Sequence, residues 1–285
     1  METMDTHTPP LFGRLCCPLD GLPLGLQARS WRCPSGHTFD MASQGYVNLL
    51  PVQNKRSRDP GDSKEMVAAR RRYLESGVYA PIADGVARVL TDSLEGQAPY
   101  ACLDAGCGEG YYLRRLQERG TRNELALIGL DISKWAVMAA ARSSPGMRWL
   151  VGSNAHLPVP DASLDAVICM FGFPVYAEFL RVLKPGGLLV QVEAGTDHLV
   201  QLRRIIYPSL KDEKPAPGGA PEGFGQETNE RLSFDFALES QEQIADLLLM
   251  TPHLFRASAQ GLEQARALTR LDLTADIRLS VSRRL

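Results

Sequence analysis

The sequence predicts an α/β protein in which a doubly wound, mostly parallel sheet follows a small cysteine-containing module. From about residue 99, short apolar runs alternate with stretches of helical character, as in strand–helix repeats. The runs are apolar almost throughout, which is typical of parallel strands covered on both faces. Residues 11–50 differ, because they are rich in Cys, Gly and Pro and too few to build a large core alone.

Length and composition favour one large domain with a small appendage. The chain has 285 residues, of which 44% are hydrophobic and 22% charged, and its formal net charge is -2. A nucleic-acid partner would therefore need a locally basic surface. The polar start and the lack of a long apolar run predict neither a signal peptide nor a membrane partner. The six cysteines lack the spacing of a disulfide framework, which points to a reducing cytoplasm.

We expect the chain to divide into three segments: a small module over 1–50, a basic loop and helical connector over 51–98, and the main domain over 99–285. In the connector, Asp62 or Ser63 is expected to cap a helix that runs through Glu75. Gly77 is expected to end that helix, because glycine readily adopts the left-handed conformation found after a helix.

The main domain is expected to contain five strands first, with helices between them. The strands are predicted over 100–103, 125–130, 147–151, 164–170 and 188–192, and the helices over 111–119, 134–141 and 175–183. Residues 211–231 are charged and rich in Pro and Gly, which predicts a mobile insertion. Strands over 232–238 and 271–281, with a helix over 240–250, would complete the sheet.

A glycine-rich turn after the first of these strands predicts the ligand site. Gly106, Gly108 and Gly110 depart from the dinucleotide fingerprint, whose third glycine lies three places after the second. Asp104 would also repel a pyrophosphate, whereas it and Glu109 suit the sulfonium and ammonium cations of S-adenosylmethionine. Free backbone N–H groups of the turn would take the carboxylate of that molecule. The turn therefore favours S-adenosylmethionine over a dinucleotide.

Two further segments fall at the carboxyl ends of neighbouring strands. Asp131 ends the second strand, about twenty residues after the turn, where a carboxylate accepts hydrogen bonds from ribose hydroxyls. Residues 152–158 follow the third strand, and Asn154 and Ala155 are candidates for the adenine edge. Ordinary turn chemistry would explain each piece alone. Together, the order and spacing of these segments along the chain favour a methyl-donor site.

Several motifs resemble known families. Residues 99–193, with Leu-Lys-Pro-Gly-Gly-Leu-Leu-Val at 183–190, look like class I S-adenosylmethionine-dependent methyltransferases. Residues 41–51 (Met-Ala-Ser-Gln-Gly-Tyr-Val-Asn-Leu-Leu-Pro), 55–62 (Lys-Arg-Ser-Arg-Asp-Pro-Gly-Asp) and 66–71 (Met-Val-Ala-Ala-Arg-Arg) resemble the RlmA family. Those enzymes are bacterial 23S rRNA (guanine-N1)-methyltransferases with an N-terminal zinc module.

The resemblance implies a fold, a reaction and further site residues. It implies a seven-stranded class I sheet behind a zinc-ribbon-like module that recognises RNA, and methyl transfer to guanine N1 in a 23S rRNA hairpin loop. Tyr79 and His198 match residues that contact the methyl donor in the family. Family members are dimers, so a homodimer is a further expectation.

The family's zinc ligands follow the pattern Cys-x2-Cys and Cys-x3-His. Here the second pair is Cys33 and His37, but the first pair is Cys17 and Asp20. Carboxylates ligate zinc less often than thiolate or imidazole in structural sites. The resemblance implies zinc on these four residues. The alternative is a metal-free module held by its apolar cluster, and Cys16 could replace Asp20 only with distortion.

A basic stretch predicts contact with RNA phosphates. Residues 51–72 carry seven Lys or Arg against three Asp or Glu, although such a cluster is often only a solvated face. With the resemblance, phosphate contact becomes the better interpretation. The candidates are Lys55, Arg56, Arg58, Arg70 and Arg71.

The catalytic residues are not fixed by the sequence. Guanine N1 carries a proton at neutral pH, so a base near N1 would help its methylation. Glu193, at the end of the fifth strand, is a candidate. Phe171 and Phe173 follow the fourth strand and are candidates to stack on a guanine drawn out of its helix, or else core residues.

Two other functions remain open. A small-molecule methyltransferase would share the superfamily motifs, but the Cys/His module and the basic stretch argue against it. A methyltransferase-like protein that binds RNA without turnover is the second alternative. The presence of Asp104, Gly106, Gly108 and Asp131 argues for donor binding and so against this second alternative.

Overall fold

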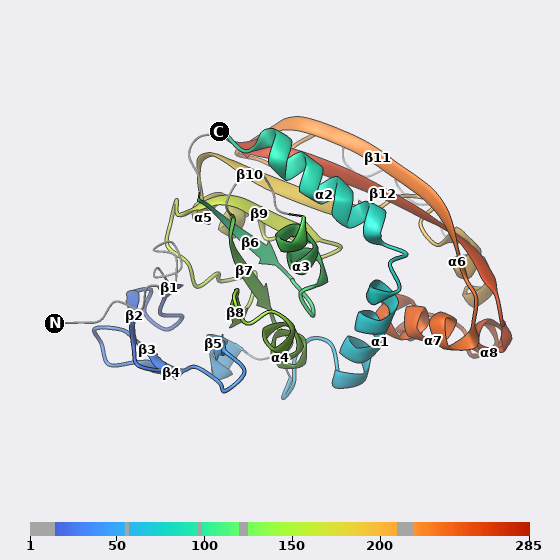
Figure 1. Cartoon of the computed structure of the whole chain (residues 1–285), viewed down its shortest axis with the longest axis horizontal. Helices are drawn as coiled ribbons and strands as arrows, with labels where there is room; N and C mark the ends of the chain where they lie inside the picture. Colours follow the sequence, from blue (N-terminus) through green and yellow to red (C-terminus); the bar gives the residue numbers. More distant parts are fainter. Residues whose placement is uncertain (1–14, 55–56, 96–98, 120–124, 210–218) are drawn as a thin grey trace.

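The structure is a computed structural model that describes residues 15–54, 57–95, 99–119, 125–209 and 219–285. It contains a four-stranded sheet near the N-terminus and an eight-stranded main sheet. Figure 1 shows the small sheet at one end of the molecule and helices α6 (Val200–Ile206), α7 (Gln241–Met250) and α8 (Ala259–Ala267) at the other.

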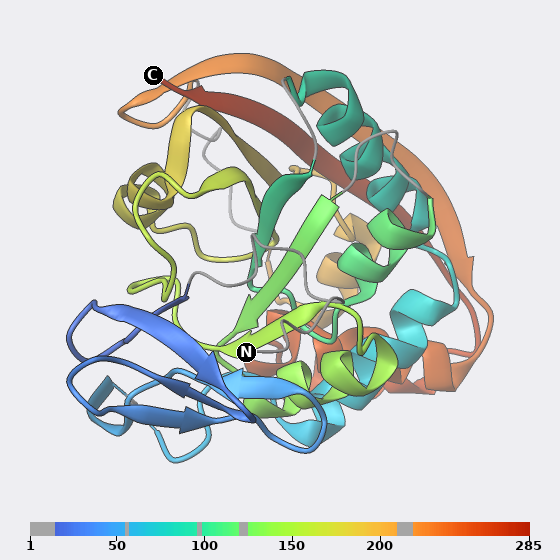
Figure 2. The ribbon, with the colours of Figure 1, turned by 60° about the vertical axis from the view of Figure 1, so that its left-hand side comes forward.

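The small sheet is antiparallel and packs on the main sheet. Its strands run in the order β1 (Leu15–Cys16), β2 (Pro23–Gln27), β3 (Ser30–Arg32) and β4 (Thr38–Asp40). Trp31 of β3 is buried in one apolar cluster with Leu103 and Leu130 of the main sheet. Arg148 lies over the ring of Trp31, 4.7 Å from its centroid. The described part of the module therefore shares its apolar core with the main sheet, and Figure 2 shows it against that sheet.

Seven strands of the main sheet form the predicted class I arrangement. They lie in the order β11-β12-β10-β9-β6-β7-β8, and β5 pairs in parallel at the outer edge of β8. The bounds are β5 (Tyr46–Asn48), β6 (Tyr100–Ala105), β7 (Leu125–Asp131), β8 (Arg148–Val151), β9 (Leu164–Met170), β10 (Leu183–Ala194), β11 (Phe224–Leu238) and β12 (Leu271–Arg284). Among the described strands of this sheet, only β12 runs antiparallel to its neighbours, β10 and β11. The expected fold class is confirmed, with β5 as an eighth strand that the sequence did not predict.

Helices cover the two faces of the sheet unequally. Residues of α1 (Lys64–Glu75), α2 (Ala80–Ser93), α3 (Tyr111–Glu118), α4 (Lys134–Ser143), α6, α7 and α8 join one apolar cluster. The other face is covered by α5 (Tyr176–Val182) and the small sheet. Short 3-10 turns span η2 (Val52–Asn54) and η3 (Pro252–Phe255). Among the described helices, none has both the length and the apolarity needed to cross a lipid bilayer.

Local sequence signals explain the start of α1. The side chain of Ser63 accepts a hydrogen bond from Met66 N at 3.3 Å, which satisfies one of the free N–H groups of the first turn. The helix ends at Glu75, and Gly77 has a φ of 84°. The predicted N-cap and stop are both confirmed.

The predicted insertion over 211–231 is wrong in its second half. Residues 224–231 belong to β11, and 210–218 lie outside the described residues. Half-buried and exposed residues alternate over 228–231 of β11 although all four are polar, because one face of this antiparallel strand meets α2 and the other is solvated. The expected boundary at residue 50 is also blurred, since β5 is part of the main sheet.

Candidate functional site

The glycine-rich turn is held against the neighbouring strand. The N–H groups of Gly106 and Cys107 both donate to Leu130 O, at 2.8 and 3.0 Å. Gly106, Gly108 and Gly110 have φ values of 106°, 56° and 84°, a region that favours glycine. A Cβ on Gly110 would also lie 2.6 Å from Trp149. Backbone conformation and packing thus both favour glycine in this turn, which lies tightly against the end of β7.

Asp104 is a buried carboxyl group without a polar partner among the described residues. The residue is 1% exposed, and neither oxygen has a hydrogen-bond partner among the described residues. Burial, and secondarily the charge of Asp131, raise the pKa of Asp104 to about 8. A carboxylate in such surroundings is stabilised by a bound cation. The predicted partners, an ammonium and a sulfonium, have that charge.

Glu109 is less free to bind the donor cation than the sequence predicted. Its Oε2 is paired with Arg114 at 2.7 Å, and Arg114 also donates to Glu109 O. Only Oε1 has no hydrogen-bond partner within the described part of the chain. Much of the charge of Glu109 is therefore already balanced by its own helix.

Asp131 faces the donor site and also holds the glycine-rich turn and the start of α4 in place. Its Oδ2 accepts from Gly108 N at 2.9 Å and its Oδ1 from Ser133 N at 2.8 Å. Burial raises the pKa of Asp131, although these two N–H groups act in the opposite direction. Each carboxylate oxygen retains a further lone pair, so ribose hydroxyls would still find acceptors.

Asn154 links two of the strand ends. Its Nδ2 donates to Ala105 O at 3.2 Å and to Phe173 O at 3.4 Å, while Oδ1 has no partner among the residues described. Ala155 is exposed, and its N–H already donates to Ser153 Oγ at 3.2 Å. The amide of Asn154 is thus the better placed of these two groups for binding a ligand.

Three aromatic rings from distant parts of the sequence meet beside the carboxyl ends of the strands that form the donor site. Tyr79 Oη lies 3.2 Å from His198 Nε2, and the ring of Phe171 lies 5.7 Å from His198 and 6.3 Å from Tyr79. His198 Nδ1 accepts from Asp276 N, so the neutral ring carries its proton on Nε2 and donates to Tyr79. Burial lowers the pKa of His198 to about 4, which keeps the ring neutral. Phe171 has a φ of 50°, a strained value for a phenylalanine.

Arg70 lies against the donor turn and not on an open face. A Cβ on Gly108 would be 3.5 Å from Arg70 Nη1, and the guanidinium is held by Asp62 at 2.5 Å and by Met250 O at 3.0 Å. The next residue, Arg71, points elsewhere and pairs with Glu75 at 2.7 Å. The sequence alone could not predict that Arg70 and Arg71 have different surroundings, because they are neighbours in one basic stretch.

The remaining candidates lie on more open surfaces. Phe173 is 91% exposed, and Glu193 is half-exposed and paired with Arg278 at 2.5 Å. Arg58 is exposed, whereas Lys55 and Arg56 lie outside the described residues. The sequence missed Arg278, because it lies on a strand with no recognisable motif.

The four predicted zinc ligands converge. One ligand atom each from Cys17, Asp20, Cys33 and His37 lies within 4.8 Å of all the others. His37 Nδ1 is 3.0 Å from Asp20 Oδ2, 3.4 Å from Cys17 Sγ and 3.3 Å from Cys33 Sγ. Ligands of a tetrahedral zinc, each about 2.0 to 2.3 Å from the metal, have similar separations.

Local geometry explains why Asp20 can replace the expected cysteine. Its Oδ1 accepts from Leu22 N at 3.0 Å, which aims Oδ2 at Cys33 and His37. Cys16 is not part of the cluster; its N–H donates to Pro158 O instead. The donor set present fits a zinc ion.

Comparison with known proteins supports both the zinc cluster of the N-terminal module and the donor site of the main domain. Residues 15–58 match the family described as "RlmA, N-terminal", and residues 102–187 match "Methyltransferase domain". The chain is 31% identical to the Bacillus subtilis protein named "Putative 23S rRNA (guanine-N(1)-)-methyltransferase YxjB", over 93% of this chain and 95% of that protein. It is 39% identical to the 23S rRNA (guanine(748)-N(1))-methyltransferase of Streptomyces fradiae, over 66% of each.

A relative from another branch matches a smaller region. The demethylmenaquinone methyltransferase of Deinococcus radiodurans is 30% identical over 51% of this chain and 65% of that protein. Together, these matches identify the cofactor of the main domain as S-adenosylmethionine and the N-terminal module as a zinc ribbon.

We expect S-adenosylmethionine binding to release a proton near pH 7. The raised pKa of Asp104, about 8, leaves this carboxyl mostly protonated in the free protein, and it must ionise to meet a cation. Affinity should therefore rise with pH up to about 8 and flatten above it. Calorimetry in buffers of different ionisation enthalpy measures the proton count. Asp104→Asn should bind more weakly and release none, whereas a wild-type binding heat independent of buffer would contradict the assignment.

We expect Asp20 to be a zinc ligand whose replacement changes metal affinity in both directions. Asp20→Ala should lower zinc affinity at least tenfold, and Asp20→Cys should raise it, because thiolate is the better structural ligand. Competition with a chromophoric chelator measures this, with zinc per chain determined in parallel. Cys16→Ala is the matched control and should leave affinity unchanged. Unaltered affinity in Asp20→Ala would show that the carboxylate does not ligate the metal.

Proposed function

The chain belongs to the RlmA family of 23S rRNA (guanine-N1)-methyltransferases, and we propose that it transfers the methyl group of S-adenosylmethionine to N1 of a guanine in a 23S rRNA hairpin loop. The observation that carries this proposal is the buried Asp104 at the end of β6, without a polar partner among the described residues, in the same chain as the convergent Cys/Asp/Cys/His cluster. The first suits a cationic methyl donor. The second lies in residues 15–58, which match the RlmA N-terminal family, and outside residues 102–187, which match the general methyltransferase domain.

We assign the donor site to residues at the carboxyl ends of β6, β7, β8 and β10, and to the start of α2. S-adenosylmethionine supplies an electrophilic methyl group on a sulfonium. Asp104 would balance its positive charge, Asp131 would accept from its ribose, and Asn154 would meet the adenine edge. The full set is Tyr79, Asp104, Gly106, Gly108, Glu109, Gly110, Asp131, Asn154, Ala155 and His198.

We add Arg70 to this set, in place of its earlier assignment to RNA. Its guanidinium lies over Gly108 with Asp62 as partner, and a carboxylate is the ligand that such a group prefers. The methionine part of the donor carries one. Arg70 would therefore hold the donor carboxylate beside the turn.

The RNA would approach from the side of the zinc module. Lys55, Arg56, Arg58 and Arg71 are proposed to meet phosphates, with Phe171 and Phe173 stacking near the target base. In this role the protein mainly aligns donor and acceptor. A cytoplasmic location and a homodimer follow from the family and remain part of the proposal.

A small-molecule acceptor is the second candidate. The match to a demethylmenaquinone methyltransferase favours it, but that match covers only about half of the chain. The match over residues 15–58 is specific to the RNA-modifying family.

The proposal is tested by transfer of labelled methyl to 23S RNA from a strain that lacks the gene for this protein. We expect the label in 1-methylguanosine after nucleoside analysis, because N1 of guanine is the proposed acceptor. Asp104→Asn should reduce the label strongly. Label in another nucleoside would exclude N1 as the acceptor, and tight donor binding without labelled RNA would favour a small-molecule acceptor or an RNA-binding role without turnover.

We expect Arg70→Met to weaken S-adenosylmethionine binding by about 10- to 100-fold, the effect of removing one charge-assisted hydrogen bond. Calorimetric titration measures the dissociation constant. Arg71→Met, on the same helix turn but paired with Glu75, is the matched control and should leave donor affinity unchanged. A loss of RNA affinity alone in Arg70→Met would return this residue to the RNA surface.

A further inference from the structure

A polar groove lies on the face of the main sheet that α5 covers only in part. It has a volume of about 660 Å³ and runs between α5 and the paired strands β11 and β12. Its floor comes from alternate residues of β10 and β12, and its walls from α5, β11 and the segment 219–223. The lining includes Tyr176, Gln191, Glu193, Asn229, Arg278 and Ser280.

The strand register explains why this face is polar. Glu193 of β10 lies opposite Arg278 of β12, and Gln191 lies opposite Ser280. The residues between them on β10, such as Val192, point into the apolar cluster on the other face. Because side chains alternate along a strand, a row of polar groups lines the groove from end to end.

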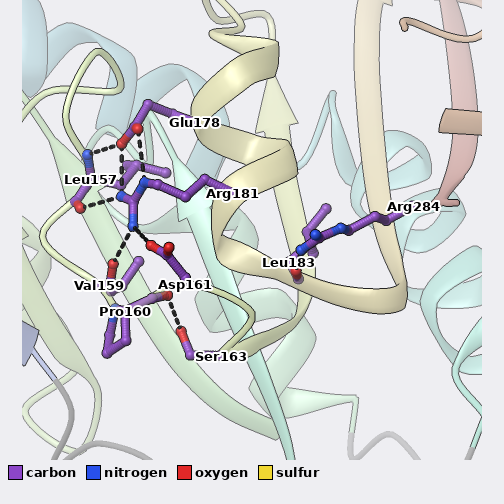
Figure 3. Close-up of polar contacts among 9 residues, drawn as sticks. All are labelled: Leu157, Val159, Pro160, Asp161, Ser163, Glu178, Arg181, Leu183 and Arg284. Atoms are coloured by element: carbon purple, nitrogen blue, oxygen red, sulfur yellow. Dashed lines mark hydrogen bonds and ion pairs between the residues drawn. The ribbon is translucent and has the colours of Figure 1, made fainter. Parts of the chain in front are cut away.

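The wall formed by α5 is rigidly placed. Arg181 of α5 donates to Leu157 O at 2.9 Å and Val159 O at 3.0 Å, and pairs with Asp161 at 2.7 Å and Glu178 at 2.8 Å (Figure 3). These contacts tie the helix to the loop after β8, which also carries Asn154. Directly after the helix, Leu183 O accepts a hydrogen bond from Arg284 of β12. Tyr176, at the start of α5, is thereby held over the groove, with its hydroxyl 3.3 Å from Gln191 Nε2.

One end of the groove adjoins the donor site. Phe171 N donates to Val192 O at 2.8 Å, so the strained aromatic loop lies beside the residue that precedes Glu193. In the sheet, β9 with Cys169 lies between β6, which carries Asp104, and β10, which carries Glu193. Burial raises the pKa of the Cys169 thiol to about 12, and the charges of Asp104 and Glu193 add to the rise. The Glu193–Arg278 pair is thus the part of the groove nearest to the buried carboxylate of the donor site.

We propose that this end of the groove receives the acceptor guanine, with Glu193 and Arg278 reading its Watson–Crick edge. The inference rests on the proposed function and names the site of its substrate. Guanine presents two neighbouring donors, N1–H and N2–H, followed by the acceptor O6. A carboxylate accepts from both donors, and a guanidinium beside it donates to O6. The 2.5 Å pair presents these two groups side by side before the base arrives.

The same two residues would serve the chemical step. Glu193 takes the N1 proton, and the negative charge that the base then carries, largely on O6, is stabilised by Arg278. The N1 electron pair forms the new N–CH3 bond, and the electrons of the broken S–CH3 bond stay on sulfur as a neutral thioether. The products are 1-methylguanine and a protonated Glu193, so charge and atoms balance.

The remaining groove would hold the neighbouring part of the RNA strand. Its lining has an aromatic ring, amides and hydroxyls with few net charges, which suits a base and a ribose better than a phosphate. Tyr176 is 37% exposed, which leaves its ring free to stack.

Two variants test the proposal, with kcat and KM for 23S RNA measured beside the dissociation constant for S-adenosylmethionine. Glu193→Gln should lower kcat at least 100-fold at pH 7, as expected for loss of a general base, and leave donor affinity unchanged. Its rate should recover as pH rises and N1 ionises without help, a response that a structural role would not give. Arg278→Met should lower kcat at least tenfold. Both variants should fold, because the pair is partly exposed and such pairs add little stability.

Glu230→Gln is the matched control, because Glu230 of β11 lies on the opposite face of the same strand pair and forms an ion pair with Arg88 of α2. It should retain wild-type kcat and KM. Wild-type kcat in Glu193→Gln, or a defect that pH does not rescue, would overturn the inference while labelled 1-methylguanosine from the wild type upholds the proposed function. Absence of that label from the wild type would instead remove the function, and this inference with it.

Discussion

The edge of the sheet that would hold the methyl donor depends on the carboxylate of Asp131. This carboxylate is the first group in a closed path of hydrogen bonds and ion pairs. It accepts from Gly108 of the turn and from Ser133, the N-cap of α4. Ser133 Oγ donates to Asp62 O, and Asp62 holds Arg70, which lies back over Gly108. Two strands, the α1 connector and the start of α4 are therefore fixed by one closed path. A donor that binds at this turn only in the folded protein would stabilise the whole path, so donor binding and fold stability should be linked.

Strained backbone and packed aromatic side chains are concentrated in the loops beside this path of contacts, on the side where the acceptor would bind. Phe171 and Leu199 both have positive φ values, 50° and 53°, in the loops after β9 and β10. Such conformations cost energy and persist only where the surroundings hold them. Here Leu199 is buried, and Phe171 packs against Tyr79 and His198. The loops are thus set in place before an acceptor arrives, which reduces the entropy cost of aligning two substrates.

Sequence reasoning found the features that depend on local pattern. The glycine turn, Asp104, Asp131 and the spacing of the Cys/His cluster are short-range signals with a physical meaning. It could not find contacts made by side chains far apart in the chain. The position of Arg70 depends on which side of α1 faces the turn, and that of Arg278 on the pairing of β12 with β10. β5 was missed because a three-residue strand carries almost no periodic signal.

The way the zinc module joins the sheet decides how it can serve the methyl-transfer site. Cys17 is a ligand, and the N–H of its neighbour Cys16 donates to Pro158 O in the loop that carries Asn154. Trp31 shares a core with Leu130, which accepts the N–H groups of the donor turn. A module on a flexible tether would only raise the local concentration of RNA. A module built into the same core would instead fix the position of the proposed RNA substrate relative to the donor, and in that role would contribute to the choice of the target base.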